Sequence, residues 1–295
     1  MANEFNYAQN FERQLDLVFR KGLLSGDLSK ANDRARFLNA DTIQIPSVTV
    51  GGYGEHDRNG GWNRKNVKNK WQPMKLEHDR NVEFLVDTMD VDETNQAVAA
   101  ANVTNEFIRE HAIPEMDSYR FSKLLTEYEA MGGTTDTTAL TEANILSVFD
   151  AMCKNMNEAE VPEEGRLLYI TPATAKLLKN ATGISRSLSV QENNGQVDRR
   201  VTALDNITIK EVPSGRMKTA YDFTDGCVPA AGAKQINMIM VHPDAVIAPI
   251  KHSAIFFFPP GQHTEGDGYL YQNRSYSDLF VLKNKVMGIQ INKEA

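Results

Sequence analysis

The sequence predicts a protein of the α+β class, in which strands and helices occupy separate stretches of the chain. Three observations support this fold class. Residues 41–87 carry β-branched side chains in partial alternation, residues 91–130 carry apolar side chains at helical spacing, and residues 236–291 return to alternating strands broken by turns. The 295 residues, of which 41% are hydrophobic, suffice for one large domain or two modest ones with a buried core.

Charge and cysteine content narrow the function. The net charge of −7 argues against a protein whose main task is to bind phosphates, because that task needs a basic surface. Cys153 and Cys227 lie far apart, which excludes a disulfide framework and a zinc site and fits a reducing compartment. Residues 1–14 lack the apolar core of a signal peptide, and runs such as 255–258 are too short to span a bilayer. We therefore expect a cytoplasmic product that does not enter membranes.

Residues 1–40 are predicted to form an N-terminal arm with one short amphipathic helix. Four apolar residues recur at helical spacing, and Gly22 and Gly26 then interrupt the pattern; the four are Phe11, Leu15, Val18 and Phe19. Because so short a segment cannot bury its own apolar stripe, the arm should dock on a larger body.

Residues 41–87 are predicted to form a long two-stranded β-hairpin. Residues 42–50 are β-branched and interrupted by Pro46, and Val82, Phe84 and Val86 alternate again as the expected return strand. Between them lies a glycine-dense tip, GGYGEHDRNGGW, that no helix would tolerate. An isolated hairpin is marginal in water, so something outside it must hold it.

Residues 91–130 predict a long helix that Pro114 should bend or restart. A linker at 131–139 follows, and Thr141 is the candidate N-cap of the next helix. The remaining predicted elements are a buried strand at 166–171, a helix from Pro172, a polar loop at 183–200, a strand at 207–212, and the C-terminal strands.

Four stretches give the chain a resemblance to a known family. They are IPEMDSYRFSKL (113–124), VPEEGRLLYITPATAKLLKN (161–180), INMIMVHPDAVIAPIKHSAIFFFPPG (236–261) and DGYLYQNRSYSDLFVLKNKVMGI (267–289). With the order of arm, hairpin, helix, mixed region and β-rich return, the chain resembles the major capsid proteins of tailed phages, which have the Hong Kong 97 fold. The last two stretches are the most specific, because they pair strand alternation with the turn residues of the family.

The resemblance implies a division of the chain. It comprises an N-terminal arm (1–40), an extended β-hairpin or E-loop (41–87), a peripheral domain with a spine helix (88–134 and 246–295), and an axial domain (135–245). It further implies hexamers and pentamers that close into an icosahedral shell enclosing double-stranded DNA, without sequence-specific binding. We expect assembly in the host bacterial cytoplasm and a final location in the virion.

The resemblance also implies partners. Some members begin with a cleaved scaffolding region; here the arm starts at Met1, so we expect a separate scaffolding protein, with a removed prodomain as the other reading, and a portal protein. The alternative function is an encapsulin-like cellular nanocompartment, whose shell of the same fold encloses cargo enzymes in place of DNA.

Charge is unevenly distributed along the chain. Residues 58–75 hold six basic residues and no acid, whereas residues 87–130 hold ten acids and three bases. We expect the basic hairpin to lie over the acidic helix of an adjacent subunit, with two tryptophans as apolar anchors. The predicted contact set is Arg64, Lys65, Lys68, Lys70, Trp62, Trp71, Glu106, Glu110 and Glu115. The alternative interpretation is that both segments are ordinary solvated charged surfaces. Nucleic-acid binding by the hairpin tip is disfavoured by the net negative charge of the chain.

The sequence predicts no enzyme, cofactor or metal site. His242, Asp244 and Ser253 lack a GxSxG elbow and suit turns, and His111 with Glu115 supplies only two candidate metal ligands. Some capsid proteins of the family join subunits by a lysine–asparagine isopeptide bond. The hairpin lysines could meet Asn273 or Asn284, but no matching set stands out, so we assign no catalytic residue.

Overall fold

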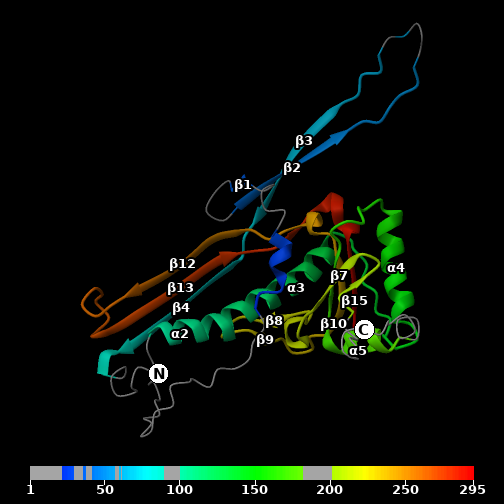
Figure 1. Ribbon diagram of the computed structural model, residues 1–295. Helices are drawn as coiled ribbons and strands as arrows, with labels where there is room; N and C mark the ends of the chain where they lie inside the picture. Colours follow the sequence, from blue (N-terminus) through cyan, green and yellow to red (C-terminus); the bar gives the residue numbers. More distant parts are fainter. Residues whose placement is uncertain are drawn as a thin grey trace, which may run out of the picture.

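The computed structural model describes residues 22–29, 36–37, 42–56, 60, 62–89, 100–181 and 201–295 (Figure 1). The predicted helix at residues 11–19 and the predicted loop at 183–200 lie outside these ranges. Helices and strands occupy separate regions, which confirms the predicted α+β class.

A five-stranded sheet forms the centre of the body, in the order β15 (Ile289–Lys293), β10 (Ile236–Val241), β5 (Leu167–Ile170), β7 (Ile207–Glu211) and β6 (Ala203–Leu204). Only the β5–β7 pair among these is parallel. Strand β5 serves two cores: Leu167 and Tyr169 belong to one apolar cluster, Leu168 and Ile170 to the other. This period of two follows from side chains alternating between the faces of a strand.

Helices cover both faces of this sheet. Helix α3 (Ile113–Ala130) packs on one face through Phe121 and Leu124. Helices α4 (Ile145–Glu158) and α5 (Pro172–Asn180) pack on the other through Phe149 and Leu178. Thr171 caps α5 by accepting a hydrogen bond from Thr174 N, and Pro172 occupies the first turn, where its missing N–H costs nothing.

The long helix is interrupted as Pro114 predicts. Helix α2 (Ala100–Phe107) passes into a π-helical turn, η3 (Ile108–Ala112), before α3 begins. Ile113 N donates to Ile108 O, five residues back, so the turn is widened immediately before the proline. Since proline has no N–H, a regular ladder could not continue through this position. Residues 90–99, the predicted start of the helix, lie outside the described ranges.

The expected return strand of the hairpin was assigned wrongly. Strand β2 (Thr42–Val50) pairs with β3 (Val67–Lys75), which is the true return strand, and β1 (Arg36–Phe37) pairs with β2. Residues 82–86 instead belong to β4 (His78–Asp87), which pairs with β13 (Gly268–Ser277), and β13 pairs with β12 (Ile250–Phe258). Alternation shows that a segment forms a half-buried strand, but it does not identify the pairing strand.

Short elements complete the described chain: η1 (Ser25–Ser29), η4 (Ser214–Arg216), β8 (Tyr221–Asp222), β9 (Val228–Pro229), η5 (Pro243–Ala245), β11 (Val246–Ile247), β14 (Phe280–Val281) and η6 (Lys283–Gly288). In Figure 1 the β4–β13–β12 sheet lies beside α2 and α3, while the β2–β3 hairpin projects away from the body. Within the described ranges, no helix has the length and apolar character needed to cross a membrane.

Candidate inter-subunit surfaces

Among the described residues, the hairpin packs against the body at its base. Ile43 is fully buried there, in a small apolar cluster with Leu76 and Phe280, and Met74 packs against the same cluster. Beyond this cluster the strands extend into solvent (Figure 1). Trp62, past the end of the paired strands, is 94% exposed. Trp62 is therefore available for contact with another molecule.

One face of the hairpin is apolar. Val67 and Trp71 are four residues apart in β3 and therefore lie on the same face, and the register pairs Val50 with Val67. All three side chains are exposed, Trp71 to 42%. Lys68 lies on the opposite face, in line with Met74 at the base. Trp71 and Lys68 therefore lie on opposite faces of the hairpin.

The basic residues sit near the end of the hairpin. Arg64, Lys65 and Lys68 are exposed. The backbone of Lys70 lies in β3 opposite Ser47, and its side chain is not among the described parts of the structure. Strand β3 is an edge strand that also contains Pro73. Lysines and proline on an edge oppose pairing with a further strand, so this hairpin is suited to contacts through its faces.

The structure separates Glu115 from the other two predicted acids. Arg80 Nε of β4 donates to Glu115 Oε1 at 2.6 Å, and the Glu115 side chain is mostly buried. His78 Nε2 lies 3.8 Å from the same oxygen, and its ring stacks on Tyr119 with centroids 3.8 Å apart. Burial, followed by the charge of Arg80, lowers the pKa of His78 to about 4. Glu115 therefore has a cationic partner within its own chain.

Glu106 and Glu110 lie one turn apart where α2 meets the π-helical turn. Desolvation and the neighbouring Glu110 raise the pKa of Glu106, which also shares a hydrogen bond with Glu110. Glu110 Oε1 is buried and has no hydrogen-bond partner among the described residues. These two acids thus form a half-buried pair, and not a freely solvated acidic stripe.

A second apolar surface, which the sequence analysis did not single out, lies on the β4–β13–β12 sheet. Ile255, Phe256 and Phe257 are consecutive in edge strand β12 and all are about half exposed, Phe256 to 51%. Because consecutive strand residues face opposite ways, β12 exposes apolar side chains on both faces, while Phe107 of α2 packs on Phe84 and Tyr271 over one of these faces. Leu85 lies on the same face as Phe256, through the row Glu83–Gln272–Phe256. The run IFFF in an edge strand was the available sequence signal.

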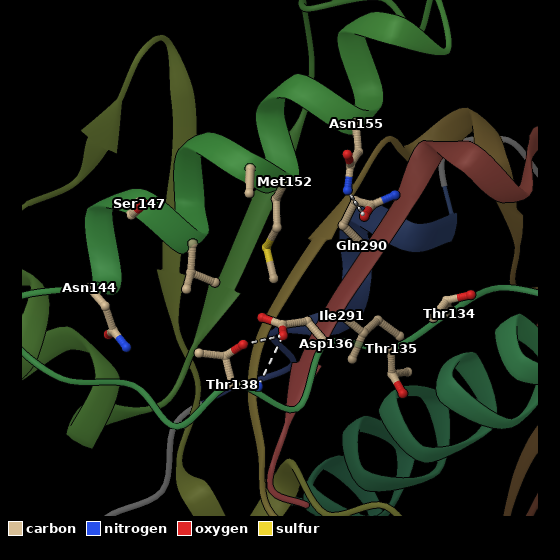
Figure 2. A pocket seen from close by; sticks show the side chains of 12 residues that line it. Thr134, Thr135, Asp136, Thr138, Asn144, Ser147, Met152, Asn155, Gln290 and Ile291 are labelled. Atoms are coloured by element: carbon tan, nitrogen blue, oxygen red, sulfur yellow. Dashed lines mark hydrogen bonds between the residues drawn. The ribbon is translucent and has the colours of Figure 1, made fainter.

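A groove of about 620 Å³ lies between α4 and β15, and Figure 2 shows its polar lining. Two hydrogen bonds join lining side chains: Thr138 Oγ1 donates to Asp136 at 2.7 Å, and Asn155 Nδ2 donates to Gln290 at 3.3 Å. At the HPD sequence, Asp244 N donates to His242 Nδ1 at 3.2 Å, the turn role that the residues suggest. In the part of the chain that is described, no group of three or more His, Cys, Asp or Glu side chains could hold a metal.

Comparisons with known proteins identify the fold. No protein-family model and no curated protein matches the chain. Among solved structures, a chain of "Asymmetric unit of bacteriophage PhiM1 mature capsid" superposes with a TM-score of 0.69 at 13% identity, covering 98% of this chain and 92% of its own. "Capsid structure of the Cyanophage P-SCSP1u" gives 0.67 at 12% identity, with coverage of 98% and 93%. "Mycobacterium phage Che8" gives 0.64 at 13% identity, with coverage of 99% and 98%.

The fold is therefore that of phage capsid chains, over almost the entire length of both partners. The predicted Hong Kong 97-type architecture is confirmed at the level of the fold. At 12–13% identity the likeness to these structures is one of fold.

Proposed function

We propose that this chain is a major capsid protein that assembles into hexamers and pentamers of an icosahedral shell around phage double-stranded DNA. One observation carries the proposal. Two long β-extensions, the β2–β3 hairpin and the β4–β13–β12 sheet, leave apolar side chains uncovered within a fold that phage capsid chains share. Exposed, apolar edges of this kind promote uncontrolled association unless a defined partner buries them.

The apolar face of the hairpin is the main docking surface in this proposal. Burial contributes about 25 cal/mol per Å² of apolar surface, whereas an exposed ion pair contributes about 0–1 kcal/mol. Val50, Val67 and Trp71 therefore outweigh the lysines in affinity. Their proposed partner is the uncovered face of β4–β13–β12 that carries Leu85 and Phe256, on an adjacent copy.

The charged residues contribute less to affinity in this proposal than the apolar face does. Arg64, Lys65, Lys68 and Lys70 steer docking and set its register, with Glu106 and Glu110 as candidate acids. Glu115 leaves the proposed set, because Arg80 already neutralises it. The division into arm, E-loop, peripheral domain and axial domain belongs to the same proposal. So do the scaffolding and portal partners, assembly in the host cytoplasm, and the absence of catalysis.

Electron microscopy tests the proposal. The full chain is purified alone and with a candidate scaffolding protein, and negatively stained particles are counted and measured. Closed shells that protect double-stranded DNA from nuclease support a capsid protein. Shells that contain cargo enzymes and no DNA support the nanocompartment alternative. Unassembled monomer under both conditions would overturn the shell function.

A further inference from the structure

Arg120 of α3 is buried in the core with one edge of its guanidinium group unbonded. Its side chain is 2% exposed. Nη1 donates to Ser25 O at 3.2 Å and to Ser25 Oγ at 3.3 Å, whereas Nε and Nη2 are buried and have no hydrogen-bond partner among the described residues. The N–H groups of Nε and Nη2 lie on the same edge of the planar guanidinium group. Because buried donors without acceptors are costly, this edge requires an acceptor.

Other arginines of the chain show what this edge binds. Arg274 Nε and Nη2 donate to the two carboxylate oxygens of Asp79, at 3.0 and 2.6 Å. In the buried Arg166, Nε and Nη2 donate to oxygens of nearby residues at 2.9 and 2.7 Å. The paired N–H groups of such an edge are suited to an anion. Arg120 presents the same edge without an acceptor from the described chain.

The hydroxyl of Tyr169 supplies a further donor. Tyr169 of β5 is fully buried on the face of the sheet that α3 covers, and its ring packs edge-on against Phe121 with centroids 5.0 Å apart. Its hydroxyl is buried and has no hydrogen-bond partner in the described part of the chain. Burial raises the pKa of this hydroxyl, nearby carboxylates raise it further, and the charge of Arg120 opposes both. The hydroxyl therefore lies within electrostatic reach of the guanidinium group.

The charged residues around these groups carry an excess of one positive charge. They are three cations and two carboxylates: Arg120, Arg216, Lys210, Asp27 and Asp117. Lys210 pairs with Asp27, and Arg216 Nη1 lies 2.9 Å from Asp117 Oδ2. Asp117 also attracts Arg120, but burial lowers the pKa of Arg120 more than this attraction raises it. One further negative charge would balance the cluster.

We propose that Arg120 Nε and Nη2, together with the Tyr169 hydroxyl, bind one small monovalent anion such as chloride between α3 and β5. All of these groups donate hydrogen bonds, and an anion accepts from each of them. A water molecule accepts only two hydrogen bonds, so it would leave one donor unmet and the charge unbalanced. The site is buried, so an acidic side chain of another molecule cannot reach it. The site lies within one subunit and does not depend on the shell function.

Urea unfolding of the unassembled full-length chain tests the site, because unfolding abolishes it. At about 0.1 M salt and equal ionic strength, chloride in place of gluconate, an anion too large for the site, is compared. Chloride should raise the folding equilibrium constant about threefold or more, as expected when its concentration exceeds about twice its Kd. Arg120→Met keeps the bulk, removes the donors and should abolish this difference. Arg274→Met removes the same edge from an exposed arginine, and this control should keep the difference.

Bromide locates the ion directly. Crystals of the full-length chain grown in sodium bromide should give an anomalous scattering peak within hydrogen-bond distance of Arg120 Nε and Nη2. Density there without an anomalous signal would identify water and overturn the proposal, as would the absence of a chloride effect on the unsubstituted chain or an equal effect on Arg120→Met. If Arg120→Met does not fold, Tyr169→Phe decides: a smaller chloride effect supports the site, and an unchanged effect contradicts it.

Discussion

At the scale of single residues, His78 shows how burial couples protonation to folding. Its ring lies between Tyr119 and Phe223, and Arg80 is close by. The folded chain therefore binds a proton at this ring only near pH 4, whereas the unfolded chain binds it near 6.5. Because the unfolded state takes up the proton first, the contribution of His78 to stability is fully present above about pH 6.5, falls toward pH 4, and changes no further below that value.

We predict that His78 lowers the free energy of unfolding by up to about 3 kcal/mol between pH 7 and pH 4. Urea unfolding at several pH values measures this loss. His78→Phe keeps a ring to stack on Tyr119 and should remove that part of the pH dependence. An identical pH profile in the variant would show that other groups cause the loss.

Glu115 gives a second prediction at this scale. Glu115→Gln should lower the free energy of unfolding by about 1–3 kcal/mol, because Arg80 then keeps a weaker acceptor in a mostly buried site. Glu106→Gln is the matched variant on the same long helix and should cost nothing, because the neighbouring Glu110 carries a like charge. Equal losses in both variants, by thermal or urea unfolding, would contradict the assigned pairing.

The residue scale also shows where prediction from sequence ends. Glu115 was grouped with Glu106 and Glu110 because all three are acids on one predicted helix. Its partner Arg80 lies 35 positions away in another element, β4, which packs against the helix through His78 and Tyr119. Charge along a chain can be counted, but a side chain within bonding distance across elements cannot.

At the scale of elements, the sequence predicts local structure correctly but does not predict which strands pair with each other. Pro114 correctly predicted a restart of the helix, because a missing N–H acts within one turn. The alternation at Val82, Phe84 and Val86 correctly predicts a strand, but the predicted pairing with residues 42–50 is wrong. Its true partner lies near the C-terminus, and the alternation of β4 suits either pairing. The two faces of the hairpin required the register of β2 with β3.

We predict that the apolar face of the hairpin controls assembly. Trp71→Ala or Val67→Ser should raise the concentration needed for shell formation more than tenfold, because a buried aromatic anchor contributes about 2 kcal/mol or more to an interface. Light scattering of the chain with its scaffolding partner measures this concentration. The midpoint of subunit unfolding should not change, since both side chains are exposed in the subunit.

Charge reversal of Lys65, Lys68 and Lys70 should act differently. We predict a change of less than about threefold in that concentration and a weaker dependence of the assembly rate on salt, as expected for steering. Unchanged salt dependence would show that the contact is not electrostatic. If charge reversal raised the concentration needed for shell formation more than Trp71→Ala does, the face of the hairpin that carries Lys68 would be the docking face.

At the scale of the whole molecule, the shell should be held by non-covalent contacts. Asn273, one of the two candidate asparagines, donates from Nδ2 to Tyr271 Oη at 3.0 Å within its own subunit. We predict that particles boiled in detergent under reducing conditions give a single band of 33.0 kDa. A ladder of larger bands would reveal a covalent link between subunits.

The junction between the hairpin and the body has a mechanical consequence. Only Leu76 and Glu77 separate β3 from β4; Leu76 is buried, its carbonyl accepts from Tyr276 Oη, and Glu77 N donates to Asp278. The hairpin is thus joined to β4 by a short junction that is hydrogen-bonded to the body. A neighbour that pulls on the hairpin pulls on β4 along its axis, and the ten paired residues of β4 share that load with β13. Force between subunits would then be transmitted from the hairpin along β4 into the sheet that β4 forms with β13.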